Sequence, residues 1–368
     1  MLRSKILLFA LLLLLFAQPG LSQDVFGLKS CGLDSDTCSG LGNSSNKPTT
    51  LYSFQPGGAL VEHGIVGRID ADGLAFSPVH GLLAFELVDS SQGPPSGSRL
   101  ILIDPVTAAS TAVGGVLSGR NIRGAAFDAG GQLWVVDTNA DELLIIDPLT
   151  GNPQGAAIPL SLGGSPFNLG ELCDIAFRRD GLLTLTHGSA TLYVLDTQTG
   201  ELTEVFQDNE ADNEIGSLPT HAGIAFDPLS PFDLYAYDVR QREDIFLYEI
   251  EIGMVRTEVY SDIVPDYNAG LGDLASETPP GCAGLPELIS DLQLETANGG
   301  FHLVLQWSDE ASADGYVIFN DSDGAGPFFH VSGSAVSGSS GVFLPMPEDD
   351  LVYILVAGDN ACGIGPKH

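Results

Sequence analysis

The chain has 368 residues, of which 44% are hydrophobic and 17% charged, and its formal net charge is −34 at pH 7. A chain of this composition is globular rather than disordered, and its length is enough for two domains. A protein with this net negative charge repels nucleic acid and anionic membrane surfaces, which excludes nucleic-acid binding. We interpret the acidity mainly as a device for solubility.

Residues 1–22 have the pattern of a secretory signal peptide. Arg3 and Lys5 precede an apolar run over residues 6–17, and the small residues Gly20 and Ser22 follow it. This order predicts export, with cleavage after Ser22 and an extracellular or periplasmic location. Because no later segment approaches 18 consecutive apolar residues, the sequence predicts no membrane span.

A short phrase ending in Ala-Phe recurs at a nearly constant interval. Its central alanines are separated by 49 to 51 residues, which is the period of a four-stranded propeller blade, and they are Ala75, Ala126, Ala176, Ala225 and Ala275. The fifth copy is degenerate and ends at Ser276. Residues 23–279 are therefore predicted to form an all-β domain, a β-propeller.

Each phrase is followed by alternating strands and polar turns. Residues 131–137 and 143–147 illustrate this, because β-branched and aromatic residues alternate there between Gly, Asp and Pro. The third strand of three blades ends in an aspartate, at Asp104, Asp147 and Asp196. An aspartate there is expected to cap a tight turn, with a following Gly supplying positive φ where present, so these carboxylates are interpreted as structural.

The fifth blade has no room for three more strands, because Pro279-Pro280-Gly281 follows its phrase closely. The missing strands are predicted at the other end of the chain, over residues 25–29, 50–54 and 60–66. The propeller would then be closed by one blade shared between its two ends, which removes exposed sheet edges. Five blades are expected, with a sixth possible if one has diverged.

The phrases Gly-Ile-Ala-Phe-Asp-Pro, Leu-Trp-Val-Val-Asp and Leu-Ile-Ile-Asp-Pro-Leu-Thr-Gly carry a resemblance over residues 24–276. The chain resembles the NHL, YVTN and gluconolactonase-like superfamily of six-bladed or seven-bladed propellers. These motifs specify blade geometry and not activity. The resemblance to gluconolactonase-like enzymes implies a metal site of Glu, Asn and Asp at the channel, for which Glu171, Asn121 and Asp273 are the nearest residue types here.

Polar residues before the Ala-Phe phrases are expected to converge at one mouth of the channel. They are Asp72, Asn121, Arg123, Glu171, Asp174, His221 and Asp273. Their oxygen atoms suit a hard cation such as calcium, although a solvated channel lined by hydrogen-bonded side chains would carry the same residues. His221 and Asp174 could also form an acid/base pair across adjacent blades. No other cofactor is indicated.

Two further features have simpler interpretations. The acidic segment 208–214 lacks the complete spacing of a calcium-binding loop and is interpreted as a solvated turn. Cys173 lies in an inner strand and is expected to be a buried, inert thiol. The other four cysteines are predicted to form two disulfides, Cys31 with Cys38 and Cys282 with Cys362, as suits an exported protein.

Residues 280–368 have short alternating strands without the blade phrase. Trp307 at the end of an early strand, Tyr316 on the next and a late strand containing Tyr353 are similar to a fibronectin type III module, which implies a β-sandwich. The chain stops where the last strand of that fold should run. Either the strand is missing or the disulfide between Cys282 and Cys362 compensates for it.

The sequence contains no recognisable catalytic motif, and propellers host many unrelated activities. The leading hypothesis is a secreted, non-enzymatic protein that presents its channel face to an extracellular protein, a carbohydrate or a small molecule. The alternative is a metal-dependent hydrolase or lactonase. It requires Glu171, Asn121, Asp174 and Asp273 to surround one point with room for a cation, rather than to be engaged with backbone groups.

Overall fold

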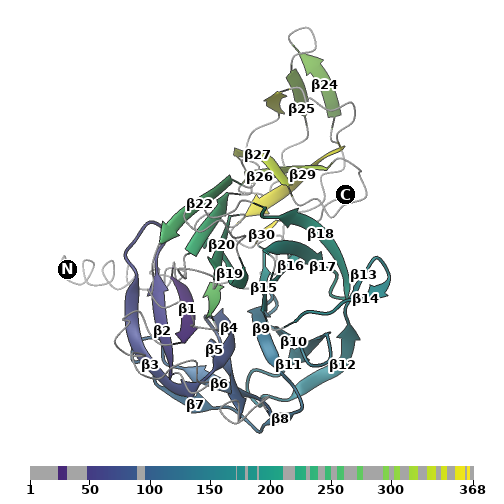
Figure 1. Ribbon diagram of the computed structural model, residues 1–368. Helices are drawn as coiled ribbons and strands as arrows, with labels where there is room; N and C mark the ends of the chain where they lie inside the picture. The colour runs from purple at the N-terminus through teal and green to yellow at the C-terminus, as the bar shows by residue number, and fades with distance from the viewer. Residues whose placement is uncertain are drawn as a thin grey trace, which may run out of the picture.

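The computed structural model of the chain consists of β-strands, and five of its sheets surround a common centre (Figure 1). In this ring it describes residues 24–30, 48–88, 96–170, 172–178, 181–188, 190–209, 220–228, 233–238, 245–249, 255–260 and 272–276. Beyond residue 292 it describes the strands of two further sheets. The predicted signal peptide, Glu171 and the four cysteines of the predicted disulfides lie outside the described residues. The described residues contain no helix long and apolar enough to cross a membrane.

Four blades are continuous in sequence, as the 50-residue period predicts. Each has four antiparallel strands and begins with an innermost strand carrying the Ala-Phe phrase. The first two are β4 (Ala71–Ser77), β5 (Gly81–Val88), β6 (Gly97–Ile103) and β7 (Ser110–Ala112), then β9 (Ile122–Phe127), β10 (Leu133–Asp137), β11 (Glu142–Ile146) and β12 (Pro153–Pro159). The next two are β15 (Cys173–Phe177), β16 (Leu183–His187), β17 (Thr191–Leu195) and β18 (Glu201–Gln207), then β19 (His221–Phe226), β20 (Leu234–Asp238), β21 (Ile245–Glu249) and β22 (Val255–Tyr260).

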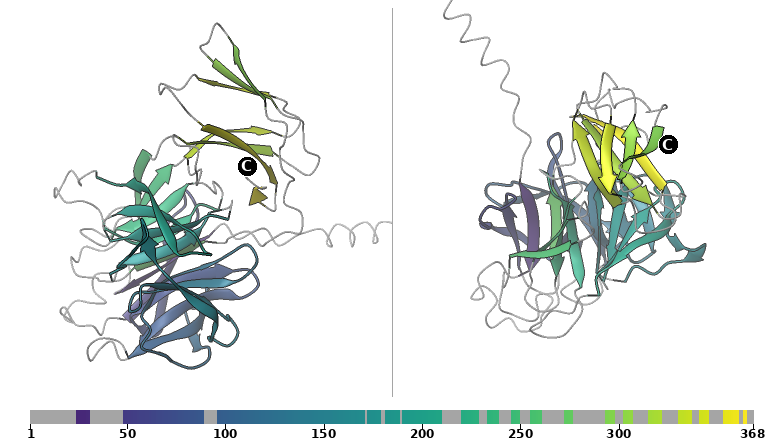
Figure 2. Two further views of the ribbon diagram at one scale, coloured as in Figure 1. Left: turned by 90° about the vertical axis from the view of Figure 1, so that its right-hand side faces the viewer. Right: turned by 90° about the horizontal axis from the view of Figure 1, so that it is seen from above.

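The fifth blade joins the two ends of the domain. Its order is β23 (Gly272–Ser276), β1 (Val25–Ser30), β2 (Pro48–Phe54) and β3 (Val61–Ile69). Strand β1 pairs antiparallel with β23, so that Val25 lies opposite Ser276 and Leu28 opposite Asp273. The prediction of a five-bladed ring closed by a shared blade is therefore confirmed, and in Figure 1 strand β1 lies nearer the centre than β2 and β3. Figure 2 shows the ring from two further directions.

Two small additions were not predicted from the sequence. Strand β8 (Leu117–Ser118) pairs with the first two residues of β6. The hairpin of β13 (Ser161–Leu162) and β14 (Ser165–Pro166) extends the third sheet, because β13 pairs parallel with β18. These segments are too short to show the alternation by which a strand is recognised.

The aspartate turns have the predicted role. Asp104 Oδ1 accepts hydrogen bonds from the backbone N–H groups of Val106 and Thr107, and Asp147 Oδ1 accepts one from Leu149. These bonds hold the pKa of the Asp104 and Asp147 carboxyl groups below the usual value. The turn of the second blade ends at Gly151 with φ +70°, a conformation that glycine adopts without strain.

The hydrophobic core consists of separate clusters, each lying between two neighbouring sheets. Apolar side chains from facing sheets form separate clusters, one of which combines Phe85 and Leu100 of the first blade with Val135 and Ile146 of the second. Such burial of apolar surface between amphipathic sheets is the main stabilising contribution in a ring of this kind. The inner strands thereby have fixed positions around the channel.

The C-terminal strands form two antiparallel sheets. The first has the order β24 (Gln293–Ala297), β25 (His302–Gln306) and β28 (Gly341–Pro345). The second has the order β27 (His330–Val336), β26 (Gly315–Asp321), β29 (Tyr353–Asn360) and β30 (Gly363–Ile364). A short last strand is thus present, because β30 pairs with the end of β29.

Candidate functional site

The candidate site lies where the inner strands begin, at the end of the channel opposite the Ala-Phe phrases. Three carboxyl groups and one guanidinium are carried there by four different strands: Asp72 on β4, Arg123 on β9, Asp174 on β15 and Asp273 on β23. All four residues are buried, with at most 6% of each exposed. The sequence predicts that these four residues lie together at the channel, and the structure carries them on four of the inner strands. What they can do chemically depends on which groups their polar atoms contact.

Asp174 connects the third blade to the fourth. Its Oδ1 accepts a hydrogen bond of 2.7 Å from the backbone N–H of Ile175, the next residue. Its Oδ2 accepts one of 2.7 Å from the backbone N–H of Ile224 on β19. Both oxygens are therefore engaged with backbone groups that would otherwise be buried without a partner.

Asp273 connects the fifth blade to the first in the same way. Its Oδ1 accepts a hydrogen bond of 2.8 Å from the backbone N–H of Leu274, and its Oδ2 accepts one from the backbone N–H of Leu74 on β4. The equivalent positions of the three other blades are glycines, Gly73, Gly124 and Gly223. A Cβ on Gly124 would lie 2.7 Å from Asp174 Cα, and one on Gly223 would lie 2.6 Å from Asp273 Cα. These last two glycines leave room for the aspartates.

The carboxyl groups of Asp174 and Asp273 are also hydrogen-bonded to each other. Such a bond needs a proton on one of the two carboxyl groups. Burial raises the pKa of both well above the ordinary value, and for Asp273 the negative charge of Asp174 adds to the rise. The pair therefore holds a proton more tightly than an exposed carboxyl group does.

Asp72 forms an ion pair with Arg123, with 3.2 Å between Oδ2 and Nη1. Burial raises the pKa of Asp72 to about 7, although Arg123 opposes the rise. Cys173 lies near this pair and is a buried free thiol, as predicted. Burial and the charge of Asp72 raise the pKa of the thiol, so it is unreactive in the folded protein.

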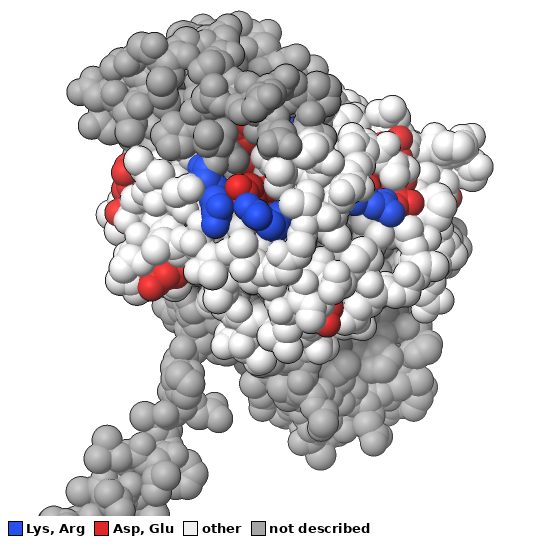
Figure 3. Space-filling model, turned by 90° about the horizontal axis from the view of Figure 1, so that it is seen from below, with Lys and Arg blue, Asp and Glu red and all other residues white. Residues whose placement is uncertain are grey.

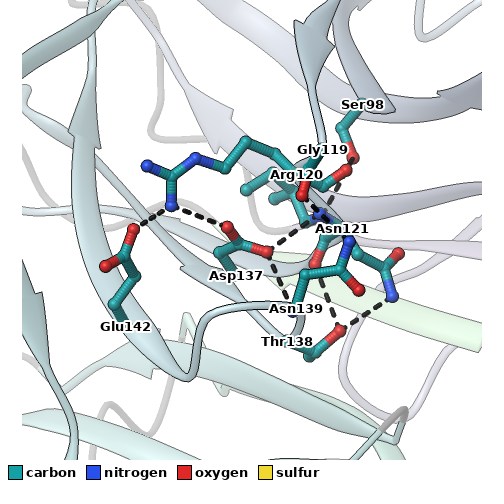
Figure 4. Close-up of polar contacts among 9 residues, drawn as sticks. Ser98, Gly119, Arg120, Asn121, Asp137, Thr138, Asn139 and Glu142 are labelled. Atoms are coloured by element: carbon teal, nitrogen blue, oxygen red, sulfur yellow. Dashed lines mark hydrogen bonds and ion pairs between the residues drawn. The ribbon is translucent and has the colours of Figure 1, made fainter. Parts of the chain in front are cut away.

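Asn121 belongs to a network that joins the start of β9 to the turn after β10 (Figure 4). Its Nδ2 donates to Thr138 Oγ1 at 2.8 Å, and its backbone N–H donates to Asp137 Oδ1 at 2.9 Å. Asp137 also pairs with Arg120, which contacts Glu142 as well. Asn121 Oδ1 is buried and has no partner. The network positions the loop that enters β9.

In the fourth blade, Asp238 plays the same part as Asp137, accepting a hydrogen bond from the backbone at the start of the inner strand. This role was not predicted from the sequence for either residue. The backbone N–H of Thr220 donates to Asp238 Oδ1 at 3.1 Å. Both aspartates end the second strand of their blade and bind the chain just as it enters the first strand. The sequence signal was available, because each closes a run of apolar residues.

His221 is fully buried and does not face Asp174 as an acid/base partner. Its Nε2 lies 2.8 Å from the hydroxyl of Tyr248, which donates to Asp208 Oδ2 at 2.6 Å. Asp208 also pairs with Arg256 at 2.9 Å. The interpretation of Asp208 as part of a solvated turn was therefore wrong, because only 2% of it is exposed. Sequence reasoning missed it because its partners follow 40 and 48 residues later.

The opposite end of the channel is apolar and narrow. It is lined by the Ala-Phe phrases, with Ala75, Ala126, Ala176, Ala225 and Ala275 contributing one methyl group from each inner strand. Among the described residues no group of three or more His, Cys, Asp and Glu is placed to hold a metal ion. Glu171, the remaining member of the predicted set, lies outside the described residues.

Comparison with known proteins gives no family. No family model matches the chain, and no curated protein matches it. Similar solved structures include a protein of unknown function from Bacteroides thetaiotaomicron VPI-5482, with 11% identity and a TM-score of 0.41, covering 77% of this chain and 73% of that one. Virginiamycin B lyase from Staphylococcus aureus has 12% identity and a TM-score of 0.33, covering 92% of this chain and 97% of the lyase.

A third similar structure is the calcium-binding protein regucalcin from Agrobacterium tumefaciens str. C58. It has 14% identity and a TM-score of 0.34, and the match covers 52% of this chain and 64% of regucalcin. At TM-scores below 0.5 these likenesses carry no functional inference.

Proposed function

We propose that the protein is an exported, non-enzymatic binding protein that contacts a partner protein through the face of the ring where the Ala-Phe phrases end. The observation that carries this proposal is the use of the channel carboxyl groups. Asp174 and Asp273 accept backbone hydrogen bonds from the neighbouring blades, and Asp72 pairs with Arg123. Groups committed in this way hold the ring together and are not free to bind a substrate or a cation.

Three turn tips support the choice of face. Val79, Val106 and Leu149 are exposed to 76%, 77% and 76%. Val79 lies between β4 and β5, and Val106 between β6 and β7. Because neighbouring strands of this sheet are antiparallel, both turns lie at the edge where β4 ends. Leu149 occupies the turn between β11 and β12, which is the equivalent place in the second blade.

The turn that carries Leu149 lies against the first blade. The carbonyl oxygen of Thr150 lies so close to Gly114, which follows β7, that a Cβ there would be 1.9 Å away. Exposed apolar residues at one face of a ring are typical of interaction surfaces. The carboxylates of Asp104 and Asp147 start the same turns. A partner with an apolar patch bordered by Lys or Arg would complement this surface.

The outer surface of the ring is a less suitable binding surface than the face that carries these turns. Seen from below in Figure 3, its described surface is largely uncharged, and the basic side chains lie beside acidic ones. Such pairs in the first blade include Arg99 with Glu86 at 2.7 Å and Arg68 with Glu86 at 3.6 Å. Charges that are already paired contribute little to attracting a charged partner.

The C-terminal sheets are proposed to be a fibronectin type III-like module. Their strand orders, β24-β25-β28 and β27-β26-β29-β30, support this proposal, since two antiparallel sheets of three and four strands form such a sandwich. We propose that this module acts as a spacer or adhesion unit beside the propeller.

Affinity capture of secreted proteins tests the proposed face. The wild type is compared with a Val106→Ser, Leu149→Ser variant and with a Val61→Ser, Ile65→Ser variant of strand β3 as a control. Val61 and Ile65 are 50% and 49% exposed and lie on another part of the ring. The proposal expects one protein to be retained by the wild type and the control but lost by the turn variant. Equal retention by all three, or calcium-dependent hydrolysis of a lactone by the wild type, would overturn it.

A further inference from the structure

We infer that a water molecule is bound in the seam between the third and fourth blades, where it donates a hydrogen bond to Nδ1 of His221 and is held by threonine hydroxyls of β16. This site is independent of the proposed function. It follows from the direction of the hydrogen bonds around His221 and from three buried polar atoms that have no partner in the protein.

The first step is the position of the tyrosine proton. Tyr248 has one hydroxyl hydrogen, and it is donated to Asp208 Oδ2 at 2.6 Å. Asp208 Oδ2 also accepts from Arg256 Nη1 at 2.9 Å, as an ionised carboxylate does. Burial and the neighbouring Asp208 raise the pKa of Tyr248 well above its ordinary value, so the hydroxyl keeps its proton.

The second step is the tautomer of His221. Its Nε2 lies 2.8 Å from the Tyr248 oxygen, whose only hydrogen is already given to Asp208. Nε2 must therefore carry the hydrogen and donate it to that oxygen. Burial lowers the pKa of His221 to about 4, so the ring is neutral at physiological pH. It follows that Nδ1 has a lone pair and acts only as an acceptor.

The third step is that this lone pair is buried without a donor. His221 Nδ1 is inaccessible to solvent and has no hydrogen-bond partner. Leaving such an acceptor unsatisfied destabilises the folded state. Buried polar atoms without a protein partner are usually satisfied by an internal water, which needs two or more polar partners itself.

The partners come from β16, which packs against β19. Thr184 and Thr186 lie two residues apart on one face of β16, and the hydroxyl of each is buried without a partner. Thr184 is paired with Ala176 and Val194, and Thr186 with Leu192. These three neighbours belong to the apolar cluster that also contains Tyr248. The two hydroxyls therefore face the same seam as the His221 ring.

The unpaired groups in the seam, one imidazole nitrogen and two hydroxyls, are suited to bind water rather than a metal ion. A threonine hydroxyl can donate to a water that in turn donates to Nδ1, so that the imidazole lone pair and that hydroxyl are satisfied together. A metal ion would need further ligands, and the described residues hold no suitable group of His, Cys, Asp and Glu. Water is the ligand class that fits one imidazole lone pair and two hydroxyls.

The tautomer is tested by NMR of the full chain labelled with nitrogen-15 in histidine, with the His221 signals identified by their absence in His221→Gln. We expect the hydrogen on Nε2 at pH 7 and no change on addition of zinc. A hydrogen on Nδ1 would overturn the inference, because Nδ1 could then not accept from water. A zinc-dependent shift of the His221 signals would overturn it in favour of a metal site.

The water itself is tested by high-resolution crystal structures of three proteins. They are the wild type, the double variant Thr184→Val, Thr186→Val, and the control variant Thr203→Val. Thr203 is an exposed residue of β18. Valine has nearly the shape of threonine but no hydroxyl, so the fold is preserved. We expect a water within hydrogen-bond distance of His221 Nδ1 in the wild type and the control, and its loss in the double variant. An empty seam in the wild type, or an unchanged water in the double variant, would overturn the inference.

Discussion

Asp273 accepts a hydrogen bond from the backbone N–H of Leu74, a residue 199 positions earlier in the chain. This contact crosses from the last inner strand to the first and closes the ring between the fifth and first blades. Asp174 makes the same kind of bond to Ile224 across the seam of the third and fourth blades. A carboxyl group that would look catalytic in a list of channel residues is thus used here to hold two blades together.

Removing the Asp273 carboxyl group should destabilise the ring. In Asp273→Ala two buried backbone N–H groups lose their acceptor, and we expect the free energy of unfolding to fall by about 2–4 kcal/mol. Asp273→Asn keeps one acceptor oxygen and should cost less. Asp104→Ala, which removes an exposed turn carboxylate, serves as the control with a small effect. Chemical denaturation measures all three, and an Asp273→Ala variant as stable as the wild type would contradict the role in closure.

The glycine that faces Asp174 should not tolerate a side chain. A Cβ on Gly124 would lie 2.7 Å from Asp174 Cα and 2.9 Å from its Oδ1, so Gly124→Ala forces the inner strands apart. Overpacking of this kind costs about 1–3 kcal/mol. Gly115→Ala is the matched control, because nothing lies within 4 Å of a Cβ there. Thermal melts in which both variants behave alike would show that the inner strands are not closely packed.

The stability of the ring should fall as the pH rises from about 4 to about 7. Burial raises the pKa of Asp72 from 3.8 to about 7 in the folded protein. The folded state therefore binds more protons than the unfolded state, and this contribution is complete below pH 3.8 and lost as the pH rises through about 7. Burial also raises the pKa of Asp174 and Asp273, which acts in the same direction.

The contribution of Asp72 is isolated by comparing variants between pH 4.5 and 7.5. His221, whose folded pKa is about 4, acts in the opposite sense in the acidic part of this range, with its contribution lost as the pH falls, but it does so equally in all the variants compared. Asp72→Asn should lose stability less steeply with rising pH than the wild type. Asp104→Asn, whose carboxyl group has a lowered pKa, should keep the wild-type slope. Identical slopes for all three proteins would rule out a titrating Asp72.

Cys173 should react only when the protein unfolds. Its thiol is buried and its pKa is raised by burial, so a thiolate does not form in the native state. We expect no alkylation of the native protein and labelling of one thiol in denaturant without reductant. Cys173→Ser should then remove that label. Three or more labelled thiols in the oxidised wild type would contradict the predicted pairing of the other four cysteines.

The architecture could be predicted because its signal repeats. Five copies of the Ala-Phe phrase fix the blade length, and the broken copy ending at Ser276 indicates that strands from residues 25–66 complete the fifth blade. Period-two patterning places each strand, since the pattern depends only on which face of a sheet is buried. The short strands β8 and β13 give no such pattern, so pairing alone defines them.

The uses of the channel residues could not be predicted, because they depend on contacts between blades. One partial signal was present. The position two residues before the central alanine is Gly124, Asp174, Gly223 and Asp273 in successive blades, and each aspartate follows a glycine that makes room for it. The burial of Asp208 left no signal at all, since Tyr248 and Arg256 are distant in sequence.

The shared blade has a consequence for the order in which the domain can form. Strands β1, β2 and β3 are synthesised first, yet their inner neighbour β23 comes after all the other blades. The earliest segment of the ring must therefore wait for the latest, and the two ends of the domain fold as one unit. A rearranged gene that moved residues 272–276 in front of residue 24 would make every blade local, and such a chain should close its ring faster. Only the packing of the fourth blade against this rearranged blade would then remain a contact between the two ends.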